Sequence, residues 1–275
     1  MSITSNDIQR AVRELGLSGQ VLCVHSSLRS LGHVEGGAGA VLDGLLAEDC
    51  TVLVPAFLYE YAISPPTDPW MRPERNGYDY DVSAETVEHS LVYSPDVNEV
   101  HKGMGALPAA VLARAERARG NHPLNSFAAV GSRARDLVGG QGPLEVYAPF
   151  EKLVECGGWV VMMGVDLTSM TLIHYAEQQA GRVLFRRWAN GSDGYPMMVA
   201  VGSCSRGFGN FDPIFAPFER QRRVGQSLWR VFPARLVLEA AAQAIRERSE
   251  ITHCIYEDCE RCNDAVQGGP LLARL

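Results

Sequence analysis

Apolar and polar positions in the first part of the chain predict a helix, a strand, a second helix and a second strand. Apolar side chains recur three and four residues apart before Gly16, which ends a helix that Ser5 can cap. Short β-branched runs then flank a second helical pattern. The order strand, helix, strand predicts a βαβ unit. The segments are 8–15 (helix), 21–24 (strand), 41–46 (helix) and 51–54 (strand).

The alternation continues in the later part of the chain. Helical spacing and short apolar runs succeed each other, and a long helical pattern fills 233–248. Such alternation predicts an α/β fold with a mixed, largely parallel sheet and helices on both faces. The expected helices are 107–118, 149–156 and 171–180, and the expected strands are 126–130, 159–165 and 197–201.

One segment breaks this periodicity. Residues 59–103 are rich in Pro, Asp, Asn and aromatic side chains. Long irregular segments of compact domains commonly cover functional sites, and the aromatic residues favour a packed cover. Because no internal repeat or linker is found, we expect a single domain over 1–275, with a C-terminal helix and a Cys-containing tail over 225–275.

Composition and charge narrow the class of protein. The 275 residues are 46% hydrophobic and 21% charged, which indicates a globular chain with a sizeable core. The net charge of -7 disfavours nucleic acid as a ligand and mildly favours cationic partners. The N-terminal residues lack a signal peptide pattern, and no apolar run reaches the length of a membrane helix. We therefore expect a cytoplasmic protein without membrane association, either a monomer or a homodimer.

A polar turn after the first strand is the first candidate for a binding site. His25, Ser26, Ser27 and Leu28 follow that strand, and the run Gly36, Gly37, Ala38 precedes the next helix. Hydroxyls and free backbone N–H groups at a strand-to-helix junction can bind an anion or a pantetheine-like amide chain. A polar turn with Ser caps explains the same residues.

A His and a Glu on one predicted helix form the second candidate. His174 and Glu177 lie three residues apart, after Thr171 and after an apolar strand, so one helix face can present both to a cleft. An imidazole is a suitable general base, and a neighbouring carboxylate can orient it. A partly buried His beside a surface Glu is the alternative interpretation.

Three further clusters of residues are weaker candidates for a functional site. His122 precedes Pro123 in a segment that ends at Ser126 and can line a site or form a structural turn. Reduced thiols are expected in the tail, although a metal site is an open alternative there. Acidic residues of the cover can form a cation-binding rim or a solvated surface. The tail cluster is His253, Cys254, Cys259 and Cys262, and the acidic cluster is Asp79, Asp81, Glu85 and Glu88.

Taken together, several motifs resemble the aminoglycoside 3-N-acetyltransferase family, the antibiotic N-acetyltransferases whose fold is distinct from that of the GCN5-related acetyltransferases. The motifs occur in family order over about residues 5 to 215. They are HSSLRSLG at 25–32 with the following GGA, TVLVP at 51–55, GMGALP at 103–108, HPxxSFAAVG at 122–131 and TxxHxxE at 171–177.

The resemblance implies acetyl transfer from acetyl-CoA to a primary amine, the 3-amino group of an aminoglycoside antibiotic, in a ternary complex. His174 resembles the general base with Glu177 beside it, and Asp212 is the match for a further carboxylate. Acetylation of another amine, or CoA binding without catalysis, remains the alternative. By similarity, coenzyme A contacts His25, Ser26, Ser27, Leu28, Gly36, Gly37, Ala38 and Ser126. Because carboxylates of the cover can pair with ammonium groups, we expect the polyamine acceptor to contact Asp79 and Asp81, and also Thr171.

Overall fold

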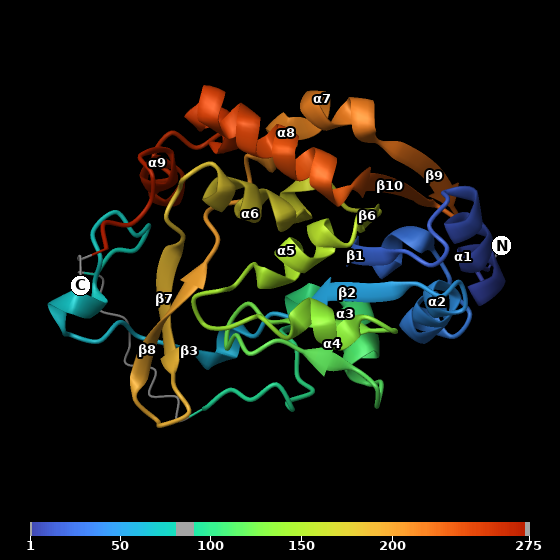
Figure 1. Ribbon diagram of the computed structural model, residues 1–275, viewed down its shortest axis with the longest axis horizontal. Coiled ribbons are helices and arrows are strands. Elements are labelled where there is room, and N and C mark those ends of the chain that lie inside the picture. Colours follow the sequence, from blue (N-terminus) through green and yellow to red (C-terminus); the bar gives the residue numbers. More distant parts are fainter. Residues whose placement is uncertain (1, 81–90, 273–275) are drawn as a thin grey trace.

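The computed structural model describes residues 2–80 and 91–272, and within these ranges the strands form two sheets. The larger sheet has the order β4-β5-β2-β1-β6-β10-β9. Its strands are β1 (Val21–Ser26), β2 (Thr51–Pro55), β4 (Ala118–Arg119), β5 (Phe127–Val130), β6 (Trp159–Met163), β9 (Arg220–Val224) and β10 (Ser227–Pro233). The mixed α/β class is confirmed (Figure 1).

The sheet is less parallel than the sequence predicts. The predicted βαβ unit forms, since β1 pairs in parallel with β2 and, on its other edge, with β6. The outer pairings β2–β5, β4–β5, β6–β10 and β9–β10 are antiparallel. The description of the sheet as largely parallel is therefore corrected. Parallel pairing is limited to the centre, because hairpins such as β9–β10, which turns at Gly225 with φ of 58°, extend the sheet at its edges.

Helices cover both faces of this sheet, as predicted. Along β1, Leu22 and Val24 face one core while Cys23 faces the other, because successive side chains of a strand alternate between faces. The first core includes α1 (Ser5–Glu14), α2 (Gly37–Leu46) and α3 (Ala106–Leu112). The second includes α4 (Ala134–Val138), α5 (Ala148–Glu155), α6 (Leu172–Gln179) and α8 (Ala234–Glu247).

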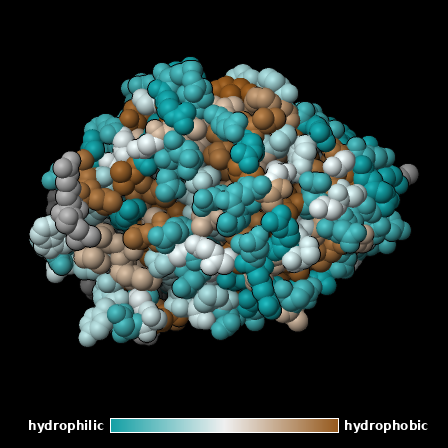
Figure 2. Space-filling model, viewed as in Figure 1, coloured by the Kyte–Doolittle hydropathy of each residue, from teal (hydrophilic) through white to brown (hydrophobic). Residues whose placement is uncertain are grey.

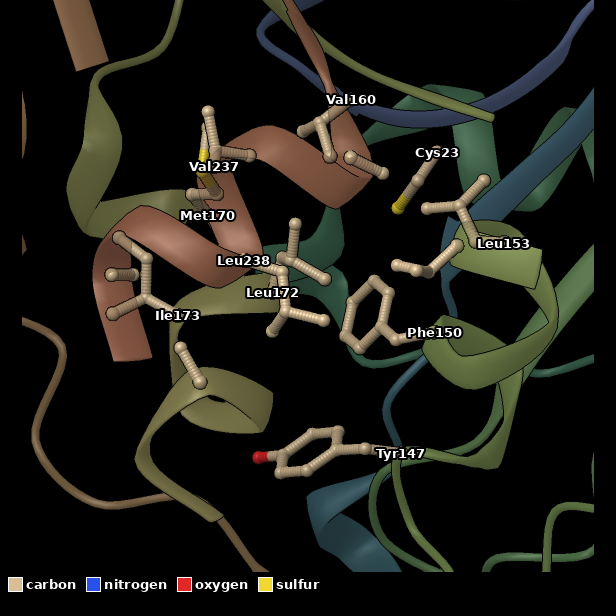
Figure 3. Packing of buried hydrophobic residues seen from close by; sticks show 14 of the residues in the cluster. Cys23, Tyr147, Phe150, Leu153, Val160, Met170, Leu172, Ile173, Val237 and Leu238 are labelled. Carbon is tan, nitrogen blue, oxygen red and sulfur yellow. The ribbon is translucent and has the colours of Figure 1, made fainter. Parts of the chain in front are cut away.

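The second core supports the helix that carries the candidate His and Glu. Leu172 and Ile173 of α6 pack toward Val237 and Leu238 of α8, and Phe150 of α5 lies beside them (Figure 3). α6 and α8 are also in extensive contact. Burial of this apolar face fixes α6 against the sheet, so its opposite side has a defined orientation.

The smaller sheet consists of β3 (Ala62–Ile63), β7 (Phe185–Asn190) and β8 (Pro196–Val201), all antiparallel. The predicted cover contributes β3 and short 3-10 turns, and is otherwise irregular in its described part. The chain closes with α7 (Asp212–Phe215), α8 and α9 (Glu260–Val266). Hydrophilic residues dominate the face in Figure 2, with apolar residues between them over α5, α6 and β7.

Two smaller expectations are also resolved. The first helix is capped by Thr4 and not by Ser5, because Thr4 and Asp7 form a reciprocal capping box. The helix expected over 107–118 ends at Leu112, and the chain turns into β4 instead. No helix in the described part of the chain is long and apolar enough to cross a membrane.

Candidate functional site

A cavity of about 1210 Å³ opens at the carboxyl ends of the three parallel strands. Residues that follow β1, β2 and β6 line it, as the topology of α/β sheets leads one to expect. The start of α3, the exit of β8 and the C-terminal tail supply the remaining walls. Lining segments are 24–29, 103–106, 168–169 and 201–206, with single residues from elsewhere that include Tyr59, Tyr147, Thr171, His174, Arg187, Cys259 and Arg261.

The cavity brings together several residues singled out from the sequence. His25, Ser26, Ser27 and Leu28 lie at the exit of β1 and line the cavity. The start of α3 and the start of α6 also line it, and Gly105 before α3 lies close to the Ser26 carbonyl. Thr171 and His174, which belong to a motif far away in the sequence, therefore share one space with the polar turn.

Four residues of the predicted cofactor set do not line this cavity. Gly36, Gly37 and Ala38 begin α2 outside it. Both glycines have positive φ, so the requirement for glycine there comes from the turn itself. Ser126 is fully buried, where its Oγ accepts from Arg119 Nε at 3.0 Å and donates to the Ala56 carbonyl at 2.9 Å. The resemblance matched these residues by sequence, but they are not among the residues that line the cavity.

His174 and Glu177 form a buried pair. One helical turn places His174 Nδ1 2.8 Å from Glu177 Oε2. Because a carboxylate only accepts hydrogen bonds, Nδ1 carries the proton that it donates. The neutral imidazole then has its lone pair on Nε2, for which no partner is found among the described residues. His174 is also one of the residues that line the cavity.

Glu177 is held by more than the imidazole. Arg182 Nη1 donates to Oε1 at 2.6 Å, and the hydroxyl of Ser203 donates to Oε2 at 2.6 Å. Burial acts to raise the pKa of Glu177, but the bonds and charges of His174, Arg182 and Ser203 outweigh it and lower the pKa. The carboxylate therefore stays charged and keeps the imidazole oriented.

Aromatic rings and one glycine confine the imidazole further. Tyr147 stacks on His174 at 6.3 Å with an interplanar angle of 9°, and Phe208 meets its other side edge-on at 4.7 Å. Gly202 lies so close that an added Cβ would be 2.6 Å from the His174 ring and from the Tyr147 hydroxyl. A side chain at position 202 would thus displace the imidazole.

Sequence analysis missed Arg182, Gly202 and Ser203. Arg182 follows Gly181 just beyond the end of α6, and the other two leave β8. The run GS at the end of an apolar strand, in a fold whose sites lie at strand ends, was a usable signal. No sequence signal indicated Arg182, because its contact with Glu177 depends on the turn of the chain at Gly181, where φ is 100°.

The remaining acidic candidates stand apart from this pair. Asp212 begins α7, where its Oδ1 accepts from Arg230 Nη2 at 2.6 Å, and it does not line the cavity. The structure therefore places the Asp212 carboxylate beside Arg230 and not on the wall that carries His174. Asp79 is exposed and is likewise not a lining residue. Asp81 lies outside the described residues, as do Glu85 and Glu88.

His122 has a structural role in the loop before β5. Its Nε2 donates to the Ala200 carbonyl at 2.8 Å, while Nδ1 accepts from the backbone N–H of Asn125 at 2.8 Å. The two neighbours that it positions, Leu124 and Asn125, line the cavity. Burial lowers the pKa of His122 to about 4, and burial has the same effect on His25. Both imidazoles are neutral in the folded protein.

These two histidines predict a loss of stability in mild acid. The unfolded chain binds protons at both imidazoles below a pKa of about 6.5, whereas the folded protein binds them only near 4. Stability should therefore fall as the pH drops from 6.5 to 4, by up to about 3 kcal/mol per residue. Urea unfolding across this range measures the slope, which His25→Gln should reduce. An identical slope in that variant would contradict the assignment.

The charge of the lining is positive in the described part of the cavity. Arg29, Arg187, Arg206 and Arg261 contribute to it, and no Asp or Glu lines it among the described residues. Arg187 is the most constrained, because its guanidinium donates to the Asn76 carbonyl at 3.1 Å and to that of Gly77 at 3.0 Å. Arg206 and Arg261 are exposed and face solvent as well as the cavity.

Fold and site define an α/β protein with an oriented His–Glu pair beside a large cavity at the ends of parallel strands. The family model for aminoglycoside 3-N-acetyltransferase matches residues 23–246. The chain belongs to the aminoglycoside 3-N-acetyltransferase family. This confirms the resemblance and the distinction from the GCN5-related fold.

Individual relatives agree with this membership. The SPbeta prophage-derived aminoglycoside N(3')-acetyltransferase-like protein YokD of Bacillus subtilis (strain 168) is 32% identical over 63% of this chain and 64% of its own. Aminoglycoside N(3)-acetyltransferase IX of Micromonospora chalcea is 32% identical over 65% of this chain and 63% of its own length. The matched part thus spans under two thirds of the length of these curated relatives.

Solved structures share the fold. The apoenzyme of aminoglycoside acetyltransferase AAC(3)-IVa superposes with a TM-score of 0.76 over 98% of both chains, at 22% identity. The binary complex of AAC-IIIb with CoASH superposes with a TM-score of 0.74 over 90% of this chain and 98% of that one, also at 22% identity.

Proposed function

We propose that this protein transfers the acetyl group of acetyl-CoA to a primary amine, with the 3-amino group of an aminoglycoside as the acceptor. The observation that carries the proposal is the His174–Glu177 pair, held at 2.8 Å with the imidazole on the cavity wall. Family membership and the names of the relatives support the substrate class. The cover over residues 59–103 would contribute to acceptor binding, since Tyr59 and Ala62 line the cavity.

Coenzyme A would contact the turn after β1 and the adjacent start of α3. His25, Ser26, Ser27 and Leu28 line the cavity there together with residues 103–106. The complex of a structural relative with CoASH supports a cofactor site in this fold. The Ser27 N–H already donates to the Met163 carbonyl at 2.9 Å, so it does not serve as an oxyanion donor.

His174 would act as the general base in a ternary complex. The neutral amine attacks the thioester carbonyl, and His174 Nε2 takes the proton that the nitrogen loses as the tetrahedral intermediate forms. The C–S bond then breaks, the amide is released, and the CoA thiolate takes the proton back from the His174 imidazolium, which returns the base to its neutral form. Glu177 stabilises the imidazolium that forms, because its carboxylate accepts the Nδ1–H.

The arginines of the lining favour a second acceptor class. An aminoglycoside is a polycation, whereas the described lining carries Arg187, Arg206 and Arg261 near the exit of β8 and the tail. Opposite charges attract and like charges repel at such distances. An amine that also carries a phosphonate, phosphate or carboxylate group would match this wall. Arg29, beside the polar turn, is instead placed to meet the phosphates of CoA.

Thiol release from acetyl-CoA in the presence of an acceptor panel tests both candidates. Thiol release with an aminoglycoside, together with an acetylated product detected by mass spectrometry, supports the aminoglycoside as the acceptor. Turnover confined to anionic amines supports the second, and Arg206→Gln should then raise the Michaelis constant for the amine about ten-fold. Arg223→Gln, exposed on edge strand β9, is the matched control. CoA binding without amine-dependent thiol would refute catalysis altogether.

A further inference from the structure

Four cysteine side chains converge beside the cavity. The sulfur atoms of Cys204, Cys254, Cys259 and Cys262 all lie within 4.8 Å of one another. Cys204 follows β8, while Cys254 and Cys259 precede α9 and Cys262 lies within it, so the fold joins two distant segments at this point. All four are free cysteines.

We propose that these four cysteines bind one zinc ion as thiolate ligands. A tetrahedral Zn²⁺ with Zn–S bonds of about 2.3 Å places its sulfurs about 3.8 Å apart, within the spacing found here. A set of four thiolates in this geometry selects zinc or mononuclear iron over the hard cations, which require oxygen ligands. An iron–sulfur cluster needs more room between its thiolates than this cluster provides. The inference does not depend on the acetyl-transfer proposal.

The surroundings fit a structural site. The backbone N–H of Cys254 points at the sulfur of Cys262 from 3.4 Å, a contact that stabilises a thiolate ligand. His253 is excluded as a ligand, because its two ring nitrogens bond the Cys254 carbonyl at 2.8 Å and Asn263 Oδ1 at 2.9 Å. With four sulfur ligands the coordination shell is closed, which is typical of a structural and not a catalytic zinc.

The zinc site would link the tail to the segment after β8, which contains Ser203 and contacts the His–Glu pair. Cys204 directly follows Ser203, whose hydroxyl donates to Glu177 at 2.6 Å. Cys204 and Cys259 both line the cavity. A metal that fixes Cys204 therefore also limits the movement of Ser203, and through it the orientation of Glu177. Ser203 is in this sense a positioning residue.

Elemental analysis of the purified full chain tests the proposal without any substrate. We expect about one zinc per chain, retained in Cys156→Ser, whose half-buried cysteine lies at the end of α5 far from the cluster in the sequence. Cys204→Ser and Cys262→Ser should each lose nearly all of the metal. Absence of zinc from protein prepared with zinc present would overturn the proposal, as would iron in its place or disulfides among these cysteines by mass analysis.

A second measurement on the wild-type chain does not depend on how the variants fold. Cobalt(II) added to chelator-treated protein should give the intense visible bands of a tetrahedral tetrathiolate complex, which zinc then abolishes. Chelation should lower the unfolding temperature, and zinc but not magnesium should restore it. A weak, octahedral cobalt spectrum with an unchanged unfolding temperature would contradict the site.

Discussion

Replacing His174 by Gln is expected to lower kcat for acetyl transfer by about 10²- to 10⁴-fold, the usual contribution of a positioned general base. Glutamine keeps an N–H that can bond Glu177, but it has no lone pair that takes up a proton near neutral pH. The loss should fall on kcat, since the base acts in the transition state and not in cofactor binding. Steady-state kinetics by thiol release measures it.

Calorimetric titration with CoA separates catalysis from binding in this variant. Its dissociation constant should stay within a few-fold of the wild-type value, because the proposed cofactor contacts are at Ser26 and Ser27, in a different segment of the cavity lining. The exposed His33→Gln serves as the matched control and should leave both constants unchanged. Near wild-type kcat in His174→Gln would remove His174 from the proposed role.

Replacing Arg182 by Met should destabilise the fold by about 3–5 kcal/mol, since it leaves a buried carboxylate without its main cation. Only 8% of Arg182 is exposed, and it also bonds the Thr252 hydroxyl at 2.8 Å and the Ser249 carbonyl at 2.6 Å. Urea unfolding at neutral pH measures the loss. Arg246→Met is the control, because Arg246 contacts the same end of α6, at the Gln179 carbonyl, but is exposed.

The pH dependence of the stability loss in Arg182→Met should show that the Glu177 carboxylate causes it. Because the pKa of Glu177 is lowered in the fold, its contribution to stability is present above its ordinary pKa of about 4.5 and is lost as the pH falls through the lower folded value. Arg182→Met should therefore lose most at neutral pH and least in acid. The double variant with Glu177→Gln should recover part of the stability. A single-variant loss below about 1 kcal/mol, with no pH dependence, would contradict the buried pair.

Local patterns predicted the centre of the fold well. Residues 21–54 formed the βαβ unit because both strands are continuous apolar runs and the helix between them has a clear apolar face. The edge strand Arg220–Val224 was missed, since its sequence RQRRV carries no apolar alternation and its pairing comes from the neighbouring β10. Edge strands are half solvated, so hydrophobicity is a weak signal there.

In the candidate site, too, local sequence patterns predicted neighbours within one element but not contacts between distant segments. His174 and Glu177 were found because helical spacing alone makes them neighbours. Arg182 and Ser203 were not, because their positions depend on the path of the chain after α6 and after β8. Asp212 was matched through the family resemblance, and its ion pair with Arg230 on β10 could not be predicted without the hairpin.

The contribution of the tail to this site has a consequence for biosynthesis. A ribosome delivers the chain from its N-terminus, so His174, Glu177 and Arg182 leave the exit tunnel well before the residues that complete their surroundings. Ser249 and Thr252 hold Arg182, while Cys259 and Arg261 close one wall of the cavity. Until Ser249 and Thr252 have been synthesised, Arg182 lacks two of its hydrogen-bond partners. The nascent protein therefore acquires a complete pocket only after residues 249–261 have been synthesised.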